Sequence, residues 1–367
     1  MDLRYRLNHP ELLPSPALLI FRAIVRENLE RMIAMAGGVE RLRPHVKTHK
    51  MAAVVRLAES LGIGKHKCAT LAEAEMVAAA GGTDVLIAYP LVGPNPGRLA
   101  DLVDRFPSTT FRATVDHLEA VSRLSAAMTT NPRPPLPVLV DLDVGMGRTG
   151  IDPSDAFALY ARVTDTPGLI ADGLHAYDGQ IRDRDLQARR ASVLPGLDAV
   201  LRLRERLRAR GDSVPRLVLG GTPTFPIYGA LDLPGLECSP GTCVLHDAGY
   251  AGKFPDLPFT PAALLLGRVV SRPRAGRLCL DLGHKAVAAD PVGDRLTLLG
   301  MPGATLGGHS EEHLIVETDR TDSTPPGTPI LAIPTHICPT CALHRRAFVV
   351  DGGDVVEEWE VTARNRT

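Results

Sequence analysis

Short apolar runs alternate with longer segments of helical periodicity between residue 41 and about residue 245. Such an alternation is typical of repeated βα units, in which each parallel strand is followed by a helix. The segments with strand character are LRPHVKT, GKHKCAT, DVLIAYP, TFRATV, PVLVDLDVG, IADGLHAYD, RLVLGG and ECSPGTCVL. The helical segments between them include MAAVVRLAESLG, LAEAEMVAAAG and residues 183–210. Eight such units predict an α/β fold with a (β/α)8 TIM-type barrel.

The sequence pattern changes beyond residue 246 to strand-like segments separated by Gly/Pro turns. They include LLLGRVVSRPRAGRLCLDLG, EHLIVETD, TPILAIP and RAFVVDGGDVVEEWEV. This pattern predicts a second, mostly antiparallel β domain. We therefore expect a barrel over residues 15–245 and a β domain over residues 246–367, with residues 1–14 joining the β domain. The segments SPALLIF and VRENLERMIAMAGG predict a strand followed by an amphipathic helix within residues 15–36.

Charge and hydropathy exclude several classes of partner. The 367 residues include 41 basic and 42 acidic side chains, without the basic excess of a nucleic-acid-binding protein. No apolar run reaches the roughly 18 residues that cross a bilayer, and the N-terminus has no apolar signal region. We expect a cytoplasmic protein that binds neither nucleic acid nor membrane. The six cysteines are scattered, so we interpret them as reduced thiols or ligands.

The segment RPHVKTHK, residues 43–50, concentrates basic residues at the end of the first expected barrel strand. In an extended strand, alternate side chains share a face. These would be Arg43, His45, Lys47 and His49. Such a face pointing into the barrel requires an anion, whereas an exposed edge strand would leave its charges solvated. The position favours the first interpretation, because the carboxyl ends of barrel strands converge on the site that barrels use.

Two further strand ends have polar residues. DVGMGRTG, residues 143–150, contains Arg148, which either reaches the site or pairs with Asp141 or Asp143. HAYDG contains His175 and Tyr177, which are site residues or satisfied core residues.

Glycines follow the last two expected strands, in the region where barrels commonly bind phosphate. LGGTPTF provides Gly220, Gly221 and Thr222, and SPGTC provides Gly241 and Thr242. Backbone N–H groups in glycine turns can approach a phosphate closely. Most glycines mark ordinary turns, so one such segment alone would not indicate a phosphate site. The two segments together do indicate one.

The segment PTHICPTC, residues 334–341, contains a candidate metal site. Its CxxC could be a redox pair or half of a zinc knuckle, but no second CxxC exists. The competing interpretation pairs His336 with Cys338, two residues apart on one face of a strand, as ligands of a metal with open positions. Cys338 could also be a buried structural residue.

These motifs resemble the D-threonine aldolase / D-serine dehydratase family, pyridoxal-phosphate enzymes with an alanine racemase-like N-terminal barrel and a β domain. The likeness runs from SPALLIF through EVTAR. It implies that Lys47 forms a Schiff base with pyridoxal 5'-phosphate, and that neighbouring cations such as Arg43, His45 and His49 favour its neutral amine.

The resemblance also implies roles for the other motifs. Arg148 would contact the phenolic oxygen of the cofactor, and His175 and Tyr177 would lie beside its pyridine ring. His336 and Cys338 would bind a divalent metal that holds the β-hydroxyl of the substrate. Cys338 favours zinc, with manganese or magnesium open. The resemblance is less specific for four further residues. Glu312 and His313 would lie near the metal, and Asp281 and Lys285 would be structural charges.

The reaction expected from this resemblance is cleavage of a D-3-hydroxy-α-amino acid by a pyridoxal-phosphate- and metal-dependent lyase. Retro-aldol cleavage of D-threonine-like substrates to glycine and an aldehyde comes first. The alternative is D-serine dehydration to pyruvate and ammonia, favoured by Cys338. An amino-acid racemase of the same fold is more distant, because racemisation needs no metal pair. A non-catalytic pyridoxal-phosphate-binding protein is also more distant, because the small single-barrel carriers lack a C-terminal β domain. A homodimer is expected by the same resemblance.

Overall fold

The computed structural model describes residues 3–366, and its contacts divide the chain into two compact units. The barrel unit comprises Glu30–Lys47, Val54–Gly241 and Asn365–Thr367. The sheet unit comprises Met1–Leu29, Thr48–Ala53 and Thr242–Arg364. The chain therefore passes from one unit to the other directly after Lys47 and again directly after Gly241.

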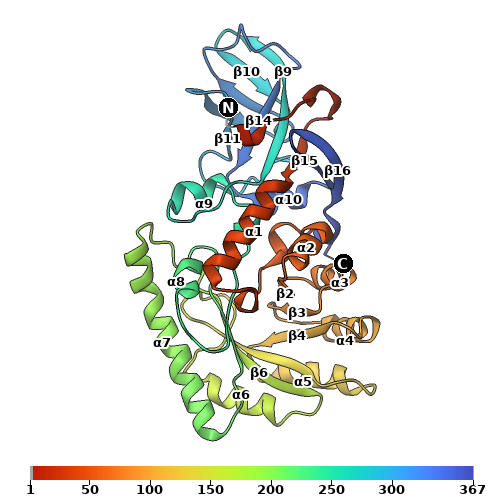
Figure 1. Ribbon diagram of the computed structural model, residues 1–367, viewed down its shortest axis with the longest axis vertical. Coiled ribbons are helices and arrows are strands. Elements are labelled where there is room, and N and C mark those ends of the chain that lie inside the picture. Colours follow the sequence, from red (N-terminus) through yellow and green to blue (C-terminus); the bar gives the residue numbers. More distant parts are fainter. Residues whose placement is uncertain (1–2, 367) are drawn as a thin grey trace. The chain divides into compact units, whose positions relative to one another are not determined.

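The barrel unit is built on a seven-stranded parallel sheet in which neighbouring strands follow one another in the sequence. Its strands are β2 (Lys65–Cys68), β3 (Asp84–Ile87), β4 (Thr110–Val115), β5 (Leu136–Leu142), β6 (Leu169–Ala176), β7 (Arg216–Leu219) and β8 (Leu236–Cys238). The helices that alternate with them are α2 (Ala52–Ser60), α3 (Leu71–Ala79), α4 (Asn95–Arg105), α5 (Leu118–Thr129), α6 (Ala156–Thr164), α7 (Leu186–Arg210) and α8 (Phe225–Gly229). Figure 1 shows α4, α5 and α6 beside the strands that they connect. This alternation confirms the predicted α/β class, with parallel strands and helices following one another as in a barrel.

Residues 42–45 connect the two edges of this sheet, although they form no regular strand. Leu42 bridges to Cys238 in β8, and His45 bridges to Lys67 in β2. The N–H of Lys67 also donates to the carbonyl of Pro44 at 2.8 Å. The strand predicted over LRPHVKT is therefore wrong beyond these bridges, because the chain turns into a 3-10 helix at Val46–Thr48. Pro44 has no N–H to donate, which shortens the possible ladder.

An ionic network occupies one level of the barrel interior. The buried guanidinium of Arg43 donates to Glu237 at 2.6 Å and to Asp84 at 2.7 Å. Arg112 bonds Asp84 and Asp172 at the same level. Arg43 thus points toward the amino-terminal part of the strands, and the expected face that combines it with Lys47 does not form.

An apolar layer lies next to this network, toward the carboxyl ends of the strands. Leu86, Leu139 and Val218 are fully buried and pack together. Leu86 follows Asp84 by two residues on β3, so both side chains face the same side of the strand. This layer separates the ionic network from the strand ends where the candidate site lies.

The longest helix of the barrel unit, α7, has 25 residues with clear signals at both ends. The carboxylate of Asp185 accepts a hydrogen bond from the N–H of Ala188, and Gly211 ends the helix with a φ of 97°. Glycine adopts this left-handed conformation without steric cost. No helix among residues 3–366 is long and apolar enough to cross a membrane.

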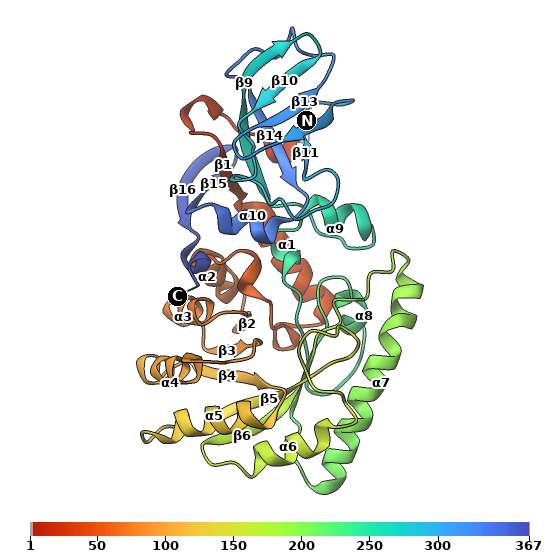
Figure 2. The same cartoon turned by 180° about the vertical axis from the view of Figure 1, so that it is seen from behind.

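The sheet unit contains a nine-stranded, mostly antiparallel sheet (Figure 2). Its strands are β1 (Ala17–Phe21), β9 (Ala263–Arg274), β10 (Arg277–Leu280), β11 (Leu296–Leu298), β12 (Thr305–His309), β13 (Leu314–Glu317), β14 (Pro329–Pro334), β15 (Arg346–Asp351) and β16 (Asp354–Glu360). The strand and helix predicted within residues 15–36 form as β1 and α1 (Arg22–Ala36). β1 pairs antiparallel with β9 and parallel with β15, so this early strand belongs to the second sheet.

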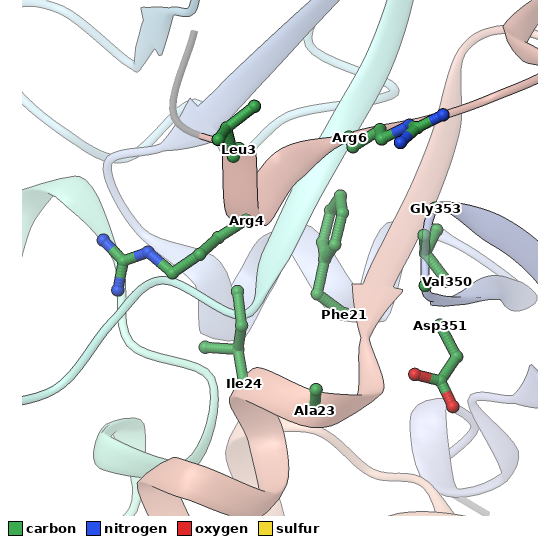
Figure 3. Close-up of a pocket in the computed structure, with 10 residues that line it drawn as sticks. Leu3, Arg4, Arg6, Phe21, Ala23, Ile24, Val350, Asp351 and Gly353 are labelled. Atoms are coloured by element: carbon green, nitrogen blue, oxygen red, sulfur yellow. The ribbon is translucent and has the colours of Figure 1, made fainter.

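A pocket of about 280 Å³ lies in the sheet unit, beside the start of α1 and the turn after β15 (Figure 3). Its lining residues are Leu3, Arg4, Arg6, Phe21, Ala23, Ile24, Val350, Asp351, Gly352 and Gly353. Asp351 in this pocket pairs with Arg22. None of the residues predicted for catalysis lines it, so this pocket is separate from the candidate chemistry.

Candidate active site

Three cationic side chains surround the ring of Tyr177, directly after β6. The Nζ atoms of Lys47 and Lys67 lie 5.8 Å and 6.0 Å from the ring centroid. The guanidinium carbon of Arg148 lies 5.1 Å from the same point. The structure therefore brings together Lys47, Arg148 and Tyr177, which the sequence singled out separately, and adds Lys67.

Lys67 lies on β2 and has only 3% of its surface exposed. Burial, followed by the positive charge of Lys47, lowers the pKa of Lys67 from 10.5 to about 7. A large part of the Lys67 side chains is therefore neutral near pH 7. Sequence reasoning missed this residue, although the strand segment GKHKCAT places two lysines on one face, which is unusual for a buried strand.

His175 and Asp141 form a hydrogen-bonded pair on neighbouring strands. Asp141 is in register with His175, and the two side chains meet at 2.6 Å between Oδ1 and Nδ1. Burial lowers the pKa of His175, although Asp141 opposes the shift. A neutral imidazole beside a carboxylate has its proton on Nδ1, which leaves Nε2 as an acceptor. That buried Nε2 has no hydrogen-bond partner among residues 3–366.

The loop after β5 presents Arg148 through a local hydrogen-bonded turn. The carboxylate of Asp143 accepts hydrogen bonds from the N–H groups of Gly145 at 2.9 Å and Gly147 at 3.1 Å. Asp141 is bonded to His175, as described above. Both carboxylates that could have paired with Arg148 thus have other partners, and its guanidinium lies near Tyr177 instead.

Glycines after β7 line the wall beside Tyr177. A Cβ atom on Gly221 would lie 2.8 Å from Cε2 of Tyr177. Gly220 has a φ of 76°, a conformation that favours glycine, and a Cβ there would lie 2.6 Å from the ring of Tyr228. The N–H of Gly241 donates to Oγ1 of Thr222 at 3.3 Å. The two glycine segments therefore meet, and a side chain at Gly220 or Gly221 would not fit beside the rings of Tyr228 and Tyr177.

His45 and His49 both bond to the backbone two residues further along. Nδ1 of His45 accepts from the N–H of Lys47 at 3.3 Å, and Nδ1 of His49 accepts from the N–H of Met51 at 3.1 Å. These bonds stabilise the turn that carries Lys47. The two histidines therefore shape this segment instead of forming the extended basic face that the sequence suggested.

In the sheet unit, His336 and Cys338 lie at the start of α10 (Ile337–Leu343). The predicted strand geometry is wrong at this point, because β14 ends at Pro334 and a helix begins. Nδ1 of His336 lies 2.5 Å from Oδ2 of Asp290. Burial alone would lower the pKa of His336, but hydrogen bonds and charge from Cys338 and Asp290 raise it to about 9.

The thiol of Cys338 faces hydroxyl groups of its own unit. Oγ1 of Thr48, the residue after Lys47, lies 3.2 Å from its Sγ, and Oγ1 of Thr242 lies 3.7 Å away. Thr242 is thus placed beside the thiol of Cys338. The other thiol of the CxxC, Cys341, is free and buried, and burial holds its pKa well above 9.0.

The donor set at α10 fits a metal with open coordination positions. An imidazole nitrogen and a thiol are ligands that zinc accepts, and a carboxylate that orients the imidazole is typical of metal sites. Residues 3–366 contain no group of three or more His, Cys, Asp or Glu side chains that could hold a metal. A metal at His336 and Cys338 would therefore need water or substrate as further ligands.

Asp247 fixes the backbone between the two candidate ligands. Its Oδ2 accepts from the N–H of Ile337 at 3.1 Å, and its Oδ1 accepts from the N–H of Tyr250 at 2.8 Å. Sequence reasoning missed both Asp247 and Asp290, because each is distant from His336 in the chain. Glu312, loosely expected near the metal, pairs instead with Lys285 at 2.9 Å.

Comparison with known proteins identifies the family. Residues 20–244 match the alanine racemase N-terminal domain, and residues 262–350 match the putative serine dehydratase domain. The D-threonine aldolase of an Arthrobacter species is 30% identical over 359 residues, which covers 95% of this chain and 92% of that protein. The chain belongs to the D-threonine aldolase family. The resemblance inferred from the motifs is thereby confirmed.

Solved structures of D-threonine aldolase family members share the whole fold. The crystal structure of D-threonine aldolase from Filomicrobium marinum has a TM-score of 0.89 and 32% identity, and 96% of each chain is covered. A D-threo-3-hydroxyaspartate dehydratase, solved as a cysteine-to-alanine variant in the metal-free form, has a TM-score of 0.81 and 25% identity. The match covers 96% of this chain and 98% of that one. The family thus includes proteins named for cleavage and for dehydration.

Proposed function

We propose that the protein is a pyridoxal-phosphate- and metal-dependent lyase of D-3-hydroxy-α-amino acids. Retro-aldol cleavage of D-threonine-like substrates to glycine and an aldehyde is the preferred reaction. The observation that supports it most is the arrangement of Lys47, Lys67 and Arg148 around Tyr177. This positive cluster requires an anion, and Lys47 provides an amine for an aldehyde.

The residues present in the barrel unit fit an anionic, aromatic aldehyde. The glycine turns at Gly220, Gly221 and Gly241 would hold its phosphate, together with Thr222. Thr242, the first residue of the sheet unit after Gly241, is proposed for the same role from the family resemblance alone. Arg148 would bind its phenolic oxygen, and the ring of Tyr177 offers an aromatic surface. The free Nε2 of His175 would accept a hydrogen bond from the bound groups or the substrate. Pyridoxal phosphate, when bound through an amine, supplies an electron sink for a bond broken at Cα.

By the family resemblance, the candidate metal ligands of the sheet unit would act on the β-hydroxyl of the substrate. A divalent metal on His336 and Cys338 would polarise a β-hydroxyl oxygen and make its proton easier to remove. Asp290 would orient the imidazole of His336, as carboxylates commonly do for metal-bound histidines. Imidazole and thiolate together favour zinc over magnesium. The metal-free form in which the dehydratase relative was solved supports a metal in this family.

Dehydration is the second candidate, and Cys338 favours it. In this reaction the Lys47 amine would remove the α-proton, and the metal would assist departure of the β-hydroxyl. The name of the dehydratase relative supports this alternative. Identities of 30% and 32% to proteins named D-threonine aldolase favour cleavage. We also propose a homodimer, which light scattering of the purified protein would test.

Product analysis tests the proposal directly. The protein, loaded with pyridoxal phosphate and zinc, is incubated separately with D-threonine, D-serine and, as a stereochemical control, L-threonine. We expect glycine and acetaldehyde from D-threonine and no product from L-threonine. Pyruvate or 2-oxobutanoate with ammonia would instead assign a dehydratase. Formation of the opposite enantiomer alone, or no reaction with any D-3-hydroxy amino acid, would contradict the proposal.

A further inference from the structure

The position of Arg148 at the candidate site depends on the loop that carries it, residues 143–150 after β5. Arg148 is exposed, and its guanidinium carbon lies 5.1 Å from the centre of the Tyr177 ring. Among residues 3–366, no hydrogen bond or ion pair holds this guanidinium. The backbone of the loop therefore sets where the guanidinium lies.

Backbone and carboxylate contacts fix both ends of this loop. The N–H of Asp143 donates to the carbonyl of Ile151, and the N–H of Ile151 donates to the carbonyl of Asp141, each at 2.9 Å. The N–H of Gly150 donates to the carboxylate of Asp116 at 3.1 Å. These bonds hold the points where the loop leaves and rejoins the barrel, but they do not reach its middle.

A side chain of the next loop holds the middle. Nε2 of Gln180 donates to the carbonyl of Val144 at 2.9 Å. The amide lies so close to the loop that a Cβ on Gly145, whose φ is 113°, would lie 2.9 Å from Nε2. Oε1 of the same amide is buried without a hydrogen-bond partner among residues 3–366. An unpaired buried oxygen costs stability, so packing alone does not explain a glutamine at this position.

Open space borders the loop beside this hydrogen bond. Val144 contacts α7 at Gly196, where a Cβ would lie 3.1 Å from the Cβ of Val144. Both residues also line a cavity of about 470 Å³ between the loop and α7. Empty space provides no packing contacts that would resist a shift of the loop. The hydrogen bond from Gln180 is therefore the contact that restrains this part of the backbone.

Gln180 and Tyr177 belong to one short segment directly after β6. The N–H of Ile181 donates to the carbonyl of Asp178 at 3.0 Å, so the segment forms a tight turn. Within the turn, Gly179 lets the ring of Tyr177 lie against the backbone, since a Cβ there would clash with the ring. The same turn thus places the ring beside the guanidinium and the amide on the loop that carries the guanidinium.

We propose that Gln180 is a positioning residue, which holds the loop after β5 so that Arg148 faces the ring of Tyr177. It acts through its amide N–H on the carbonyl of Val144, and not through contact with cofactor or substrate. The inference rests on the proposed function, in which Arg148 binds the phenolic oxygen of pyridoxal phosphate. A loop released from Gln180 would move the guanidinium away from that oxygen and weaken cofactor binding.

The first test measures the mobility of the loop in the cofactor-free protein, by limited trypsin digestion after Arg148. Gln180→Met removes the donor, and Gln180→Glu keeps the shape but turns an oxygen toward the carbonyl of Val144. Both should be cut after Arg148 about 5- to 10-fold faster, relative to cleavage elsewhere, because one hydrogen bond that opposes local opening is lost. Gln187→Met, at the exposed glutamine of α7, is the matched control and should be cut like the wild type.

The second test asks whether Gln180 acts through Arg148. Absorbance titration gives the apparent Kd for pyridoxal phosphate of the wild type, Gln180→Met, Arg148→Met and the double variant, each verified as folded by circular dichroism. Gln180→Met should raise the Kd about 5- to 10-fold in the wild-type background and leave it unchanged in the Arg148→Met background. A residue with a merely structural role would weaken binding equally in both backgrounds.

Three results would overturn the inference. One is wild-type cleavage and cofactor affinity in the folded Gln180→Met and Gln180→Glu proteins. Another is an equal loss of affinity with and without Arg148. The third needs no variant: wild-type protein cut after Arg148 as fast as a free peptide of residues 140–155. If Arg148→Met alone binds the cofactor like the wild type, the role of Arg148 in the proposed function fails, and the inference fails with it.

Discussion

The imidazole of His175 and the carboxylate of Asp141 meet at 2.6 Å on neighbouring strands of the barrel. The carboxylate keeps the imidazole proton on Nδ1, so that Nε2 remains an acceptor at the floor of the candidate site. This orientation depends on a carboxylate, because an amide in its place can donate a hydrogen bond.

Asp141→Asn should therefore reverse the role of His175. The new amide would donate to Nδ1 and shift the imidazole proton to Nε2, as a carboxylate-to-amide change beside a catalytic histidine does. We expect kcat/KM for D-3-hydroxy amino acid cleavage to fall about 10- to 100-fold with little change in Tm. Normal turnover by a folded Asp141→Asn protein would show that the tautomer is unimportant.

Arg43→Met should reduce stability, because its charge holds the ionic network of the barrel together. Removing the fully buried guanidinium takes one partner from Glu237, which keeps Lys65, and one from Asp84, which keeps Arg112, and it costs up to about 3–5 kcal/mol. Urea unfolding measures this loss. The control is Arg105→Met, which breaks an exposed pair with Glu75 and should cost less than about 1 kcal/mol. A structural role for Arg43 would be contradicted if Arg43→Met left the stability unchanged but lowered kcat in proportion to a loss of metal or cofactor.

Cys338→Ser should release the metal, whereas Cys341→Ser should keep it. Cys338 lies at the open start of α10 beside His336, but Cys341 is buried and has a strongly raised pKa. Zinc content after dialysis against a weak chelator distinguishes the two variants. We expect activity to follow the zinc content and the pyridoxal-phosphate absorbance to remain. Equal zinc in both variants would rule out Cys338 as a ligand.

His246→Phe should make the protein less sensitive to acid. Both ring nitrogens of His246 are buried without partners among residues 3–366, and burial lowers its pKa from 6.5 to about 4. The folded state therefore resists protonation, so stability is full above pH 6.5 and is lost as the pH falls toward 4. The shift corresponds to a loss of about 3 kcal/mol at most.

Urea midpoints at pH 7.5 and pH 4.5 measure this effect for the wild type and for His246→Phe. His246 has a φ of 49°, which penalises phenylalanine equally at both pH values, so the penalty cancels in the difference. On acidification, the free energy of unfolding of the wild type should fall by about 2–3 kcal/mol more than that of the variant. If the wild type and His246→Phe lose the same free energy of unfolding, His246 is protonated without cost in the folded protein.

The sequence predicts the architecture because its periodicity reports which faces are buried. Alternating βα segments define β2 to β8, and the strand TFRATV has the bounds of β4. Pairing partners far apart in the chain leave no such local signal. β1 therefore gives no indication that it lies between β9 and β15. Similarly, the partners of Arg43 lie on β3 and β8 and could not be predicted from residues 43–50 alone.

The sequence predicts only those residues of the candidate site that have a local signal. Lys47, Arg148, His175 and Tyr177 stand at strand ends or in motifs, so residue type and position together identify them. Asp290, a carboxylate partner of His336, lies in an irregular exposed segment without a motif. Lys67 lies within a strand whose local sequence pattern would also fit an ordinary exposed face. Only its burial and its distance from Tyr177 distinguish it.

The central claim is that Lys47 is the amine that binds pyridoxal phosphate covalently. Its most direct test is the absorbance of wild-type and Lys47→Ala protein, each purified with the cofactor and then reduced with borohydride for peptide mapping. Before reduction, we expect the wild-type protein to show the yellow absorbance of the bound cofactor, near the edge of the visible range. After reduction, it should carry the cofactor on Lys47. Lys47→Ala should lose the colour, the adduct and the activity while keeping its Tm. A coloured, active Lys47→Ala protein, or an adduct mapped to another lysine, would contradict the account.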